Sequence, residues 1–100
     1  MTKWADYAIT AVQYNDDHTR IMIVKRRMDL GEKLSEPDIK TRTEVVDSIK
    51  SGSSYVTAYY RNNQWQKGDN VIAYEIDGEY FIRTDGNRKK EDNLGELPEF

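Results

Sequence analysis

The sequence predicts an α+β domain: a small antiparallel five-stranded curled sheet, or an SH3-like half-open barrel, with one helix in the order β-β-α-β-β-β and an ordered C-terminal tail. Three observations support this class. The chain has 100 residues, the size of a single domain spanning 1–100. Five segments are rich in β-branched and aromatic residues. One further segment carries a helix-start signal followed by helical periodicity.

The first two predicted strands form a hairpin. Residues 7–14 alternate apolar with small or polar side chains, and residues 19–28 are β-branched and apolar before they become basic. The Asn15-Asp16-Asp17-His18 segment between them is a polar turn whose side chains can bond their own backbone. Residues 29–40 contain Gly31 and Pro37 and show no period, so we expect a loop there.

The helix signal lies at residues 41–50. Thr41 and Glu44 have the spacing of a capping box, in which each side chain bonds the other residue's backbone amide. The next apolar residues fall on one helical face: Val45, Val46 and Ile49. Gly52 can adopt the left-handed conformation that ends a helix. Because so short a helix is unstable alone, it must pack on a sheet.

Three more strands are predicted after the helix. Residues 54–61 are rich in tyrosine, valine and threonine, and residues 71–76 and 79–84 form a second hairpin. Asp77-Gly78 between the latter two favours a type I′ turn, which needs positive φ at both central positions. Residues 62–69 are predicted to be a polar connection.

The segment 85–100 is polar at first but ends in apolar residues: Leu94, Leu97, Pro98 and Phe100. A disordered tail gains nothing from such residues, so we expect this one to dock on a face or edge of the sheet. Its expected contacts are with Trp4, Leu34 and Trp65. A calcium loop beginning at Asp85 fails, because Lys90 stands where the sharp turn needs glycine.

Composition and motifs exclude several kinds of site. The absence of cysteine removes disulfides, zinc ribbons and thiol nucleophiles, and His18 alone cannot build a nitrogen-based metal site. Neither a Gly-x-Gly-x-x-Gly nor a phosphate-binding P-loop motif occurs. We therefore predict no enzyme activity, no cofactor and no metal. His18 is expected to be an exposed turn residue.

Charge and hydropathy bear on partners and location. The net charge of −3 provides no general basic field for nucleic acid. No apolar run approaches the roughly 20 residues of a membrane helix. The lack of cysteine and of a signal peptide favours a cytoplasmic location without membrane contact.

Aromatic and basic residues form the predicted interaction surface. Its members are Tyr59, Tyr60, Trp65, Tyr74, Arg83, Arg88, Lys89 and Lys90. The favoured function is a small binding module for a protein partner, or a homodimer, because exposed aromatic residues on a compact scaffold are typical of interfaces. The alternative is a small barrel that binds nucleic acid through Arg26, Arg61, Arg83 and the basic run 88–90, which the net charge disfavours. A third hypothesis is an enzyme with an unrecognised pair of carboxylates.

The chain also resembles a known family. The resemblance rests on the opening Lys3-Trp4-Ala5-Asp6-Tyr7, the helix end Ile49-Lys50-Ser51-Gly52, the Trp65-Gln66-Lys67-Gly68 segment, and the closing Phe81-Ile82-Arg83-Thr84-Asp85 with Asp92-Asn93-Leu94-Gly95-Glu96-Leu97-Pro98. These segments are similar to those of the bacterial family called domain of unknown function 3892 (DUF3892). The resemblance implies a small stand-alone protein with an ordered tail, and it brings no catalytic residue or ligand.

Overall fold

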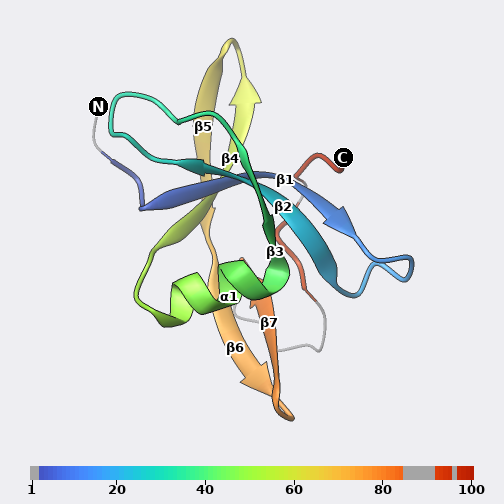
Figure 1. Ribbon diagram of the computed structural model, residues 1–100. Helices are drawn as coiled ribbons and strands as arrows, with labels where there is room; N and C mark the ends of the chain where they lie inside the picture. The colour runs from blue at the N-terminus through green and yellow to red at the C-terminus, as the bar shows by residue number, and fades with distance from the viewer. Residues whose placement is uncertain (1–2, 85–91, 96) are drawn as a thin grey trace.

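The structure, a computed structural model, describes residues 3–84, 92–95 and 97–100. It contains seven strands and one helix among these residues (Figure 1). In chain order they are β1 (Tyr7–Tyr14), β2 (Ile21–Met28), β3 (Asp38–Thr41), α1 (Arg42–Lys50), β4 (Tyr55–Arg61), β5 (Gln64–Asn70), β6 (Ile72–Ile76) and β7 (Glu79–Arg83).

Five strands form one sheet in the order β3-β2-β1-β4-β5, and β6 and β7 form a separate hairpin. All neighbours in the large sheet are antiparallel except β1 and β4, which run parallel and pair from Tyr7↔Tyr55 to Ile9↔Thr57. A parallel pair needs a crossover connection, and here α1 supplies it. The predicted α+β class, with one helix and a five-stranded sheet, is confirmed. The prediction that all strands are antiparallel is wrong, because β1 and β4 run parallel, and the last two strands stand outside the large sheet.

Two strands were missed by the prediction. The expected loop 29–40 ends in β3, and the expected polar connection 62–69 contains β5. Both are edge strands in which half or more of the residues are exposed; β3 has only four residues, and β5 has no β-branched residue. Edge strands gain their stability from one neighbour only, so hydrophobic alternation marks them weakly.

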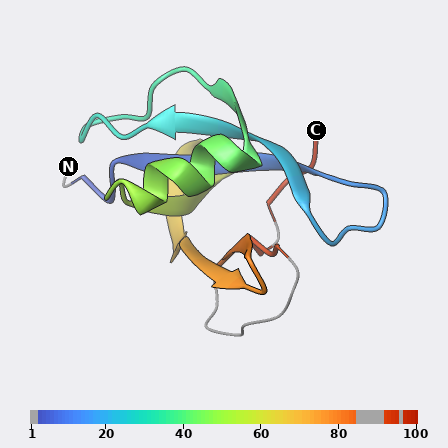
Figure 2. The same cartoon turned by 60° about the horizontal axis from the view of Figure 1, so that its bottom comes forward.

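The helix begins and ends where the sequence predicts. Thr41 is the N-cap of a complete capping box with Glu44, and Gly52 has a φ of +103°. Val45 and Val46 are buried against the sheet. Figure 2 shows the helix lying across one face of the sheet, with the β6–β7 hairpin beyond it.

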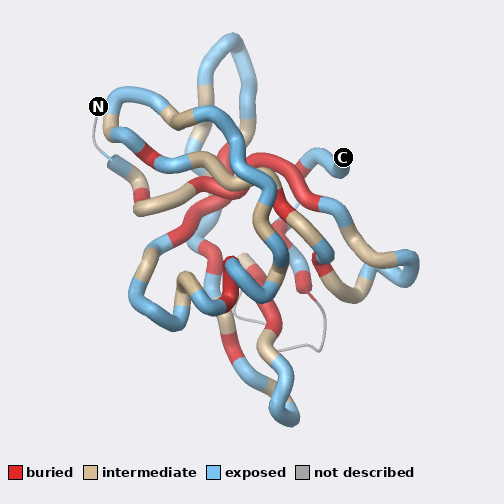
Figure 3. The backbone as a smooth tube through the Cα atoms, viewed as in Figure 1, coloured by how far each residue is buried: buried red, intermediate tan, exposed pale blue. Residues whose placement is uncertain are grey.

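Apolar side chains form two clusters on opposite faces of the large sheet. The main cluster, on the helix face, contains Ile9, Tyr55 and Val45 together with other residues of β1, β2, α1 and β7. Ala8 and Val56 alternate with Ile9 and Tyr55 along their strands, so they belong to the opposite, outer face. There they pack with Ala5 and Ala58 under Trp4, Leu34 and Trp65. Figure 3 shows the buried backbone concentrated at the centre of the molecule, where β1 and the start of β4 lie.

The last residues of the tail, 98–100, dock on β1. The amide of Val12 donates to the Pro98 carbonyl at 2.9 Å, and the amide of Phe100 donates to the Val12 carbonyl at 3.1 Å. Because β4 leaves β1 after Thr57, the tail occupies the edge of β1 that β4 has vacated. Leu94 is completely buried in the main cluster.

Leu97 also joins the main cluster, whereas Trp4, Leu34 and Trp65 belong to the outer one. The prediction that the tail packs on these three residues is therefore wrong for Leu94 and Leu97, although Pro98 lines one hollow together with Trp65. The sequence shows that the tail is apolar, but it does not show which face of the sheet receives it.

Asp92 fixes the start of the docked tail. Its carboxylate has no exposed area and accepts from the backbone amides of Ile21 at 2.8 Å and Ile82 at 2.9 Å. It also accepts from Arg42 Nε at 2.6 Å. Arg42 in turn donates to the Tyr80 carbonyl. One carboxylate thus joins β2, β7, the helix and the tail.

Candidate functional site

The β4–β5 hairpin is an exposed, projecting part of the sheet. Beyond Thr57 it has lost its contact with β1 and projects from the body of the protein, at the top of Figure 1, with an exposed tip in Figure 3. Asn62 and Asn63 form the two-residue turn with φ values of +54° and +63°. Positive φ at both positions is the type I′ geometry, and asparagine tolerates it better than most residues.

The ribbon of this hairpin has two distinct faces. Tyr60 pairs with Trp65, and their side chains lie on the outer face together with Ala58. Tyr59 pairs with Gln66, and alternation places their side chains on the opposite face. A partner that contacts the hairpin therefore meets aromatic side chains on one face and mainly polar ones on the other.

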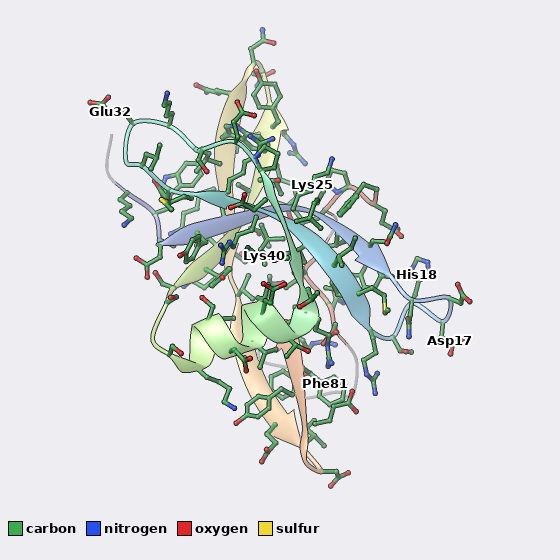
Figure 4. All side chains as sticks on the ribbon, viewed as in Figure 1. Asp17, His18, Lys25, Glu32, Lys40 and Phe81 are labelled. Atoms are coloured by element: carbon green, nitrogen blue, oxygen red, sulfur yellow. The ribbon has the colours of Figure 1, made fainter. Side chains whose placement is uncertain are left out.

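The outer face carries an aromatic hollow of about 280 Å³. The rings of Tyr60 and Trp65 meet edge to face, with centroids 5.1 Å apart, and the guanidinium of Arg27 lies 4.9 Å from the Trp65 ring centroid. The lining residues come from three segments and are Trp4, Glu32, Lys33, Leu34, Tyr60, Asn63, Gln64 and Trp65. Figure 4 shows Glu32 at the outer end of the loop that flanks this hollow.

The opposite face carries a polar cleft of about 670 Å³. Its lining residues are Tyr59, Arg61, Asn62, Gln66, Lys67, Asp69 and Gly95. The guanidinium of Arg61 lies 5.6 Å from the Tyr59 ring centroid. Within the part of the chain that the structure describes, neither Arg61 nor Lys67 lies within ion-pair distance of a carboxylate. Their charges are therefore available to a partner.

A third hollow of about 270 Å³ shares lining residues with each of the other two. It shares Tyr60 and Trp65 with the aromatic hollow, and Tyr59 and Arg61 with the polar cleft. Its remaining walls are Thr10 of β1 and Pro98 of the tail. The docked tail therefore helps to shape this surface.

Charge distinguishes the hairpin from the rest of the chain. Residues 58–68 contain Arg61 and Lys67 and no aspartate or glutamate, although the whole chain has 18 acidic and 15 basic residues. This segment also contains four carboxamide side chains: Asn62, Asn63, Gln64 and Gln66. The hairpin is a locally positive element, rich in hydrogen-bond donors, on an acidic protein.

The structure brings together only some of the residues predicted for the interaction surface. Tyr59, Tyr60 and Trp65 line the hollows of one hairpin, and Tyr60 is 60% exposed. Tyr74 and Arg83 are buried, so the prediction that they lie on this surface is wrong. Tyr74 packs on its cross-strand neighbour Phe81, with ring centroids 6.1 Å apart, on the face of the β6–β7 hairpin opposite to Ala73 and Ile82, which join the main cluster. Arg88, Lys89 and Lys90 lie outside the described residues.

The basic run of β2 is divided between the two faces of the sheet. Lys25 Nζ lies 4.9 Å from the centroid of Phe100, whereas the guanidinium of Arg26 lies 4.1 Å from the Tyr7 ring and donates to the Tyr55 hydroxyl at 3.1 Å. Arg27 lies over Trp65. Each cation of the run therefore meets a different aromatic ring, and the three do not form one patch.

The buried carboxylates have structural partners. Asp29 accepts from the backbone amides of Trp4, Ala5 and Gly31. Asp92 is held as described above. No group of three or more histidine, aspartate or glutamate side chains that could hold a metal ion occurs among residues 3–84, 92–95 and 97–100. His18 is an exposed turn residue that stacks on Tyr14 and lies 3.8 Å from Glu99, and Figure 4 shows it at the tip of the β1–β2 turn.

The sequence analysis missed three contributors to this surface: Arg27, Trp4 and Leu34. They lie far from the hairpin in sequence, and no local pattern joins them to it. The absence of acidic residues between positions 58 and 68 is a local signal, and it marks the hairpin in an otherwise acidic chain.

Comparison with protein families now adds to this description. Residues 8–98 match the family model described as protein of unknown function (DUF3892). The chain belongs to this family. The match covers nearly all of the sheet, the helix and the docked tail. No curated protein and no solved structure matches the chain significantly. No helix within the described ranges is long and apolar enough to cross a membrane.

Proposed function

We propose that this DUF3892 protein is a small non-catalytic binding module that holds a segment of a partner polypeptide on its β4–β5 hairpin. The observation that carries the proposal is the pair Tyr60 and Trp65, which lines two hollows of a projecting ribbon. Tyrosine, tryptophan and arginine dominate the energetics of protein interfaces, and Arg27 and Arg61 stand beside this pair. The cysteine-free composition supports a cytoplasmic setting.

The arrangement supports an anchor function in physical terms. Tyr60 is 60% exposed, so a partner that covers it removes a large aromatic side chain from water. Trp65 is already packed on Ala58 and Val56 and is held by Arg27, so it loses little conformational freedom when a partner binds. A partly fixed anchor of this kind reduces the entropy cost of association.

Selection from a random peptide library on the intact protein tests the proposal. The dissociation constants of selected peptides are then measured by fluorescence anisotropy for the wild type, Tyr60→Ala and the control Met22→Ala. Met22 is 53% exposed and lies at the opposite end of β2 from Arg27. We expect Tyr60→Ala to weaken binding about tenfold or more, as loss of an interface anchor does. An equal affinity of Tyr60→Ala and wild type for every selected peptide would contradict the proposal.

Single-stranded nucleic acid is the second candidate ligand. The observation that favours it is the combination of aromatic rings with two cations on the acid-free segment 58–68 of the hairpin, since bases stack on such rings. Its weakness is the small number of cations: Arg83 is buried and Arg26 is engaged with Tyr7 and Tyr55. A single-stranded oligonucleotide titrated at low ionic strength separates the two candidates. If the wild type binds the oligonucleotide at low ionic strength and Tyr60→Ala does not, the result would favour nucleic acid as the ligand.

A further inference from the structure

The hairpin has an open sheet edge beside its two faces. β5 is the last strand of the five-stranded sheet, so no described strand lies on its outer side. Arg61 and Gln64 close a two-residue turn, and in this geometry the closing pair exchanges both backbone hydrogen bonds. Pairs then alternate, so the backbone groups of Gln64 and Gln66 point to β4. Those of Trp65 and Lys67 therefore point away from the sheet.

A strand added along this edge would meet a different environment on each face. Its side chains would alternate between the faces of the ribbon, as those of β5 do. On the outer face they would enter the aromatic hollow beside Trp65 and Leu34. On the opposite face they would enter the polar cleft, which Arg61, Lys67 and Gln66 line. The two hollows thus select different side chains at alternate positions of one strand.

Charge decides which strand fits. Segment 58–68 of the hairpin carries Arg61 and Lys67 and no acidic residue, and neither cation lies within ion-pair distance of a carboxylate in the described chain. Asp69 of β5 is the one carboxylate of the hairpin and also lines the polar cleft, so β4 and β5 together keep an excess of one positive charge. A second copy of this chain, paired edge to edge, would place two such positive ribbons side by side, and like charges on facing strands repel. An acidic strand gains attraction at the same place. Exposed lysine on an edge strand commonly prevents self-association in this way.

We propose that the partner segment is an extended acidic peptide, with carboxylates alternating with apolar side chains, that pairs with the outer edge of β5. The proposal rests on the proposed function and specifies the chemistry of the partner. Backbone pairing with Trp65 and Lys67 provides affinity. The aromatic hollow takes the apolar side chains, and the polar cleft takes the carboxylates.

Three synthetic ten-residue peptides test this inference. In the first, glutamate alternates with valine; in the second, lysine replaces each glutamate; in the third, two valines of the first are replaced by proline, which cannot pair along a strand. Binding to the ¹⁵N-labelled intact protein is followed by NMR, and amide hydrogen exchange is measured with and without each peptide. We expect the first peptide alone to bind and to slow exchange at the Trp65 and Lys67 amides at least tenfold.

Protein variants test the charge requirement. Lys67→Glu should weaken binding of the glutamate peptide at least tenfold, whereas Lys50→Glu, an exposed change on the helix, should leave it within twofold of wild type. Circular dichroism confirms that both variants are folded. Equal binding of the lysine or proline peptide would overturn the inference.

The outcome also separates this inference from the proposed function. Library-selected peptides that need Tyr60 but do not protect the Trp65 and Lys67 amides would overturn strand addition and leave the binding module standing. Formation of a dimer by the protein alone, with these same amides protected, would overturn the acidic partner in favour of a second copy. An absence of peptide binding in both experiments would overturn both proposals.

Discussion

Replacement of Asp92 by alanine tests how the tail is held. In the wild type this carboxylate accepts from the amides of Ile21 and Ile82 and forms a 2.6 Å bond with Arg42. Asp92→Ala removes these acceptor contacts at once, together with a longer one of 3.4 Å from the Arg42 guanidinium. Two amides in a buried region then lose their acceptor, and Arg42 loses its buried counter-charge.

The expected loss of stability follows from these contacts. Removal of one partner of a buried ion pair costs about 3–5 kcal/mol. We expect a value near the lower limit, because Arg42 is 20% exposed, lies 3.6 Å from Glu79, and still donates to the Tyr80 carbonyl. A loss of about 3 kcal/mol is a large part of the 5–15 kcal/mol typical of small domains. It corresponds to a decrease in Tm of roughly 12–24 °C for a chain of this size.

Urea unfolding followed by tryptophan fluorescence measures the change. Asp17→Ala serves as the control, because Asp17 lies exposed in the β1–β2 turn (Figure 4). We expect the control to remain within about 0.5 kcal/mol of wild type, as is usual for exposed substitutions. A loss below about 1 kcal/mol for Asp92→Ala would refute the conclusion that this carboxylate joins the tail to the sheet.

Two further changes test other parts of the structure. A Cβ on Gly68 would lie 2.2 Å from Thr57 Oγ1 and 3.1 Å from the Thr57 carbonyl oxygen. Gly68→Ala should therefore lower the free energy of unfolding by about 1–3 kcal/mol, measured by urea unfolding. An unchanged urea midpoint would contradict the close approach of β4 and β5 at this bulge. Burial raises the pKa of Tyr14 above its ordinary value of 10.0, so its stabilising effect is complete below that pH and is lost as the pH rises through the folded-state pKa. As the pH is raised above 10, the free energy of unfolding of Tyr14→Phe should therefore fall less than that of the wild type. Urea unfolding of both proteins at several alkaline pH values measures this difference. An equal fall in both proteins would contradict a raised pKa of Tyr14.

Local patterns predicted the local elements well. The capping box at Thr41 and Glu44, the ends of β1, and the turn at Asp77 and Gly78 depend on neighbouring residues, and the structure contains each of them. The parallel pairing of β1 with β4 depends on residues about 48 positions apart. No local pattern reports such a contact, so the sequence predicted five strands without their correct order in space.

The candidate site shows the same division. Tyr59, Tyr60 and Trp65 are neighbours in one hairpin, so composition was sufficient to select them as a group. Tyr74 and Arg83 have suitable side chains too, but both are buried. The exposure of these two side chains depends on how the β6–β7 hairpin packs against the rest of the protein. Residue propensities do not predict such packing between segments that are distant in sequence.

The central claim is that the β4–β5 hairpin is the surface that contacts a partner. The most direct test is a ¹H–¹⁵N chemical-shift map of the intact protein, titrated with the tightest peptide selected from the random library. We predict that the largest shift changes occur at residues 58–68 and in the flanking segment 32–34. Shift changes concentrated on the helix or on the β6–β7 hairpin would contradict the claim.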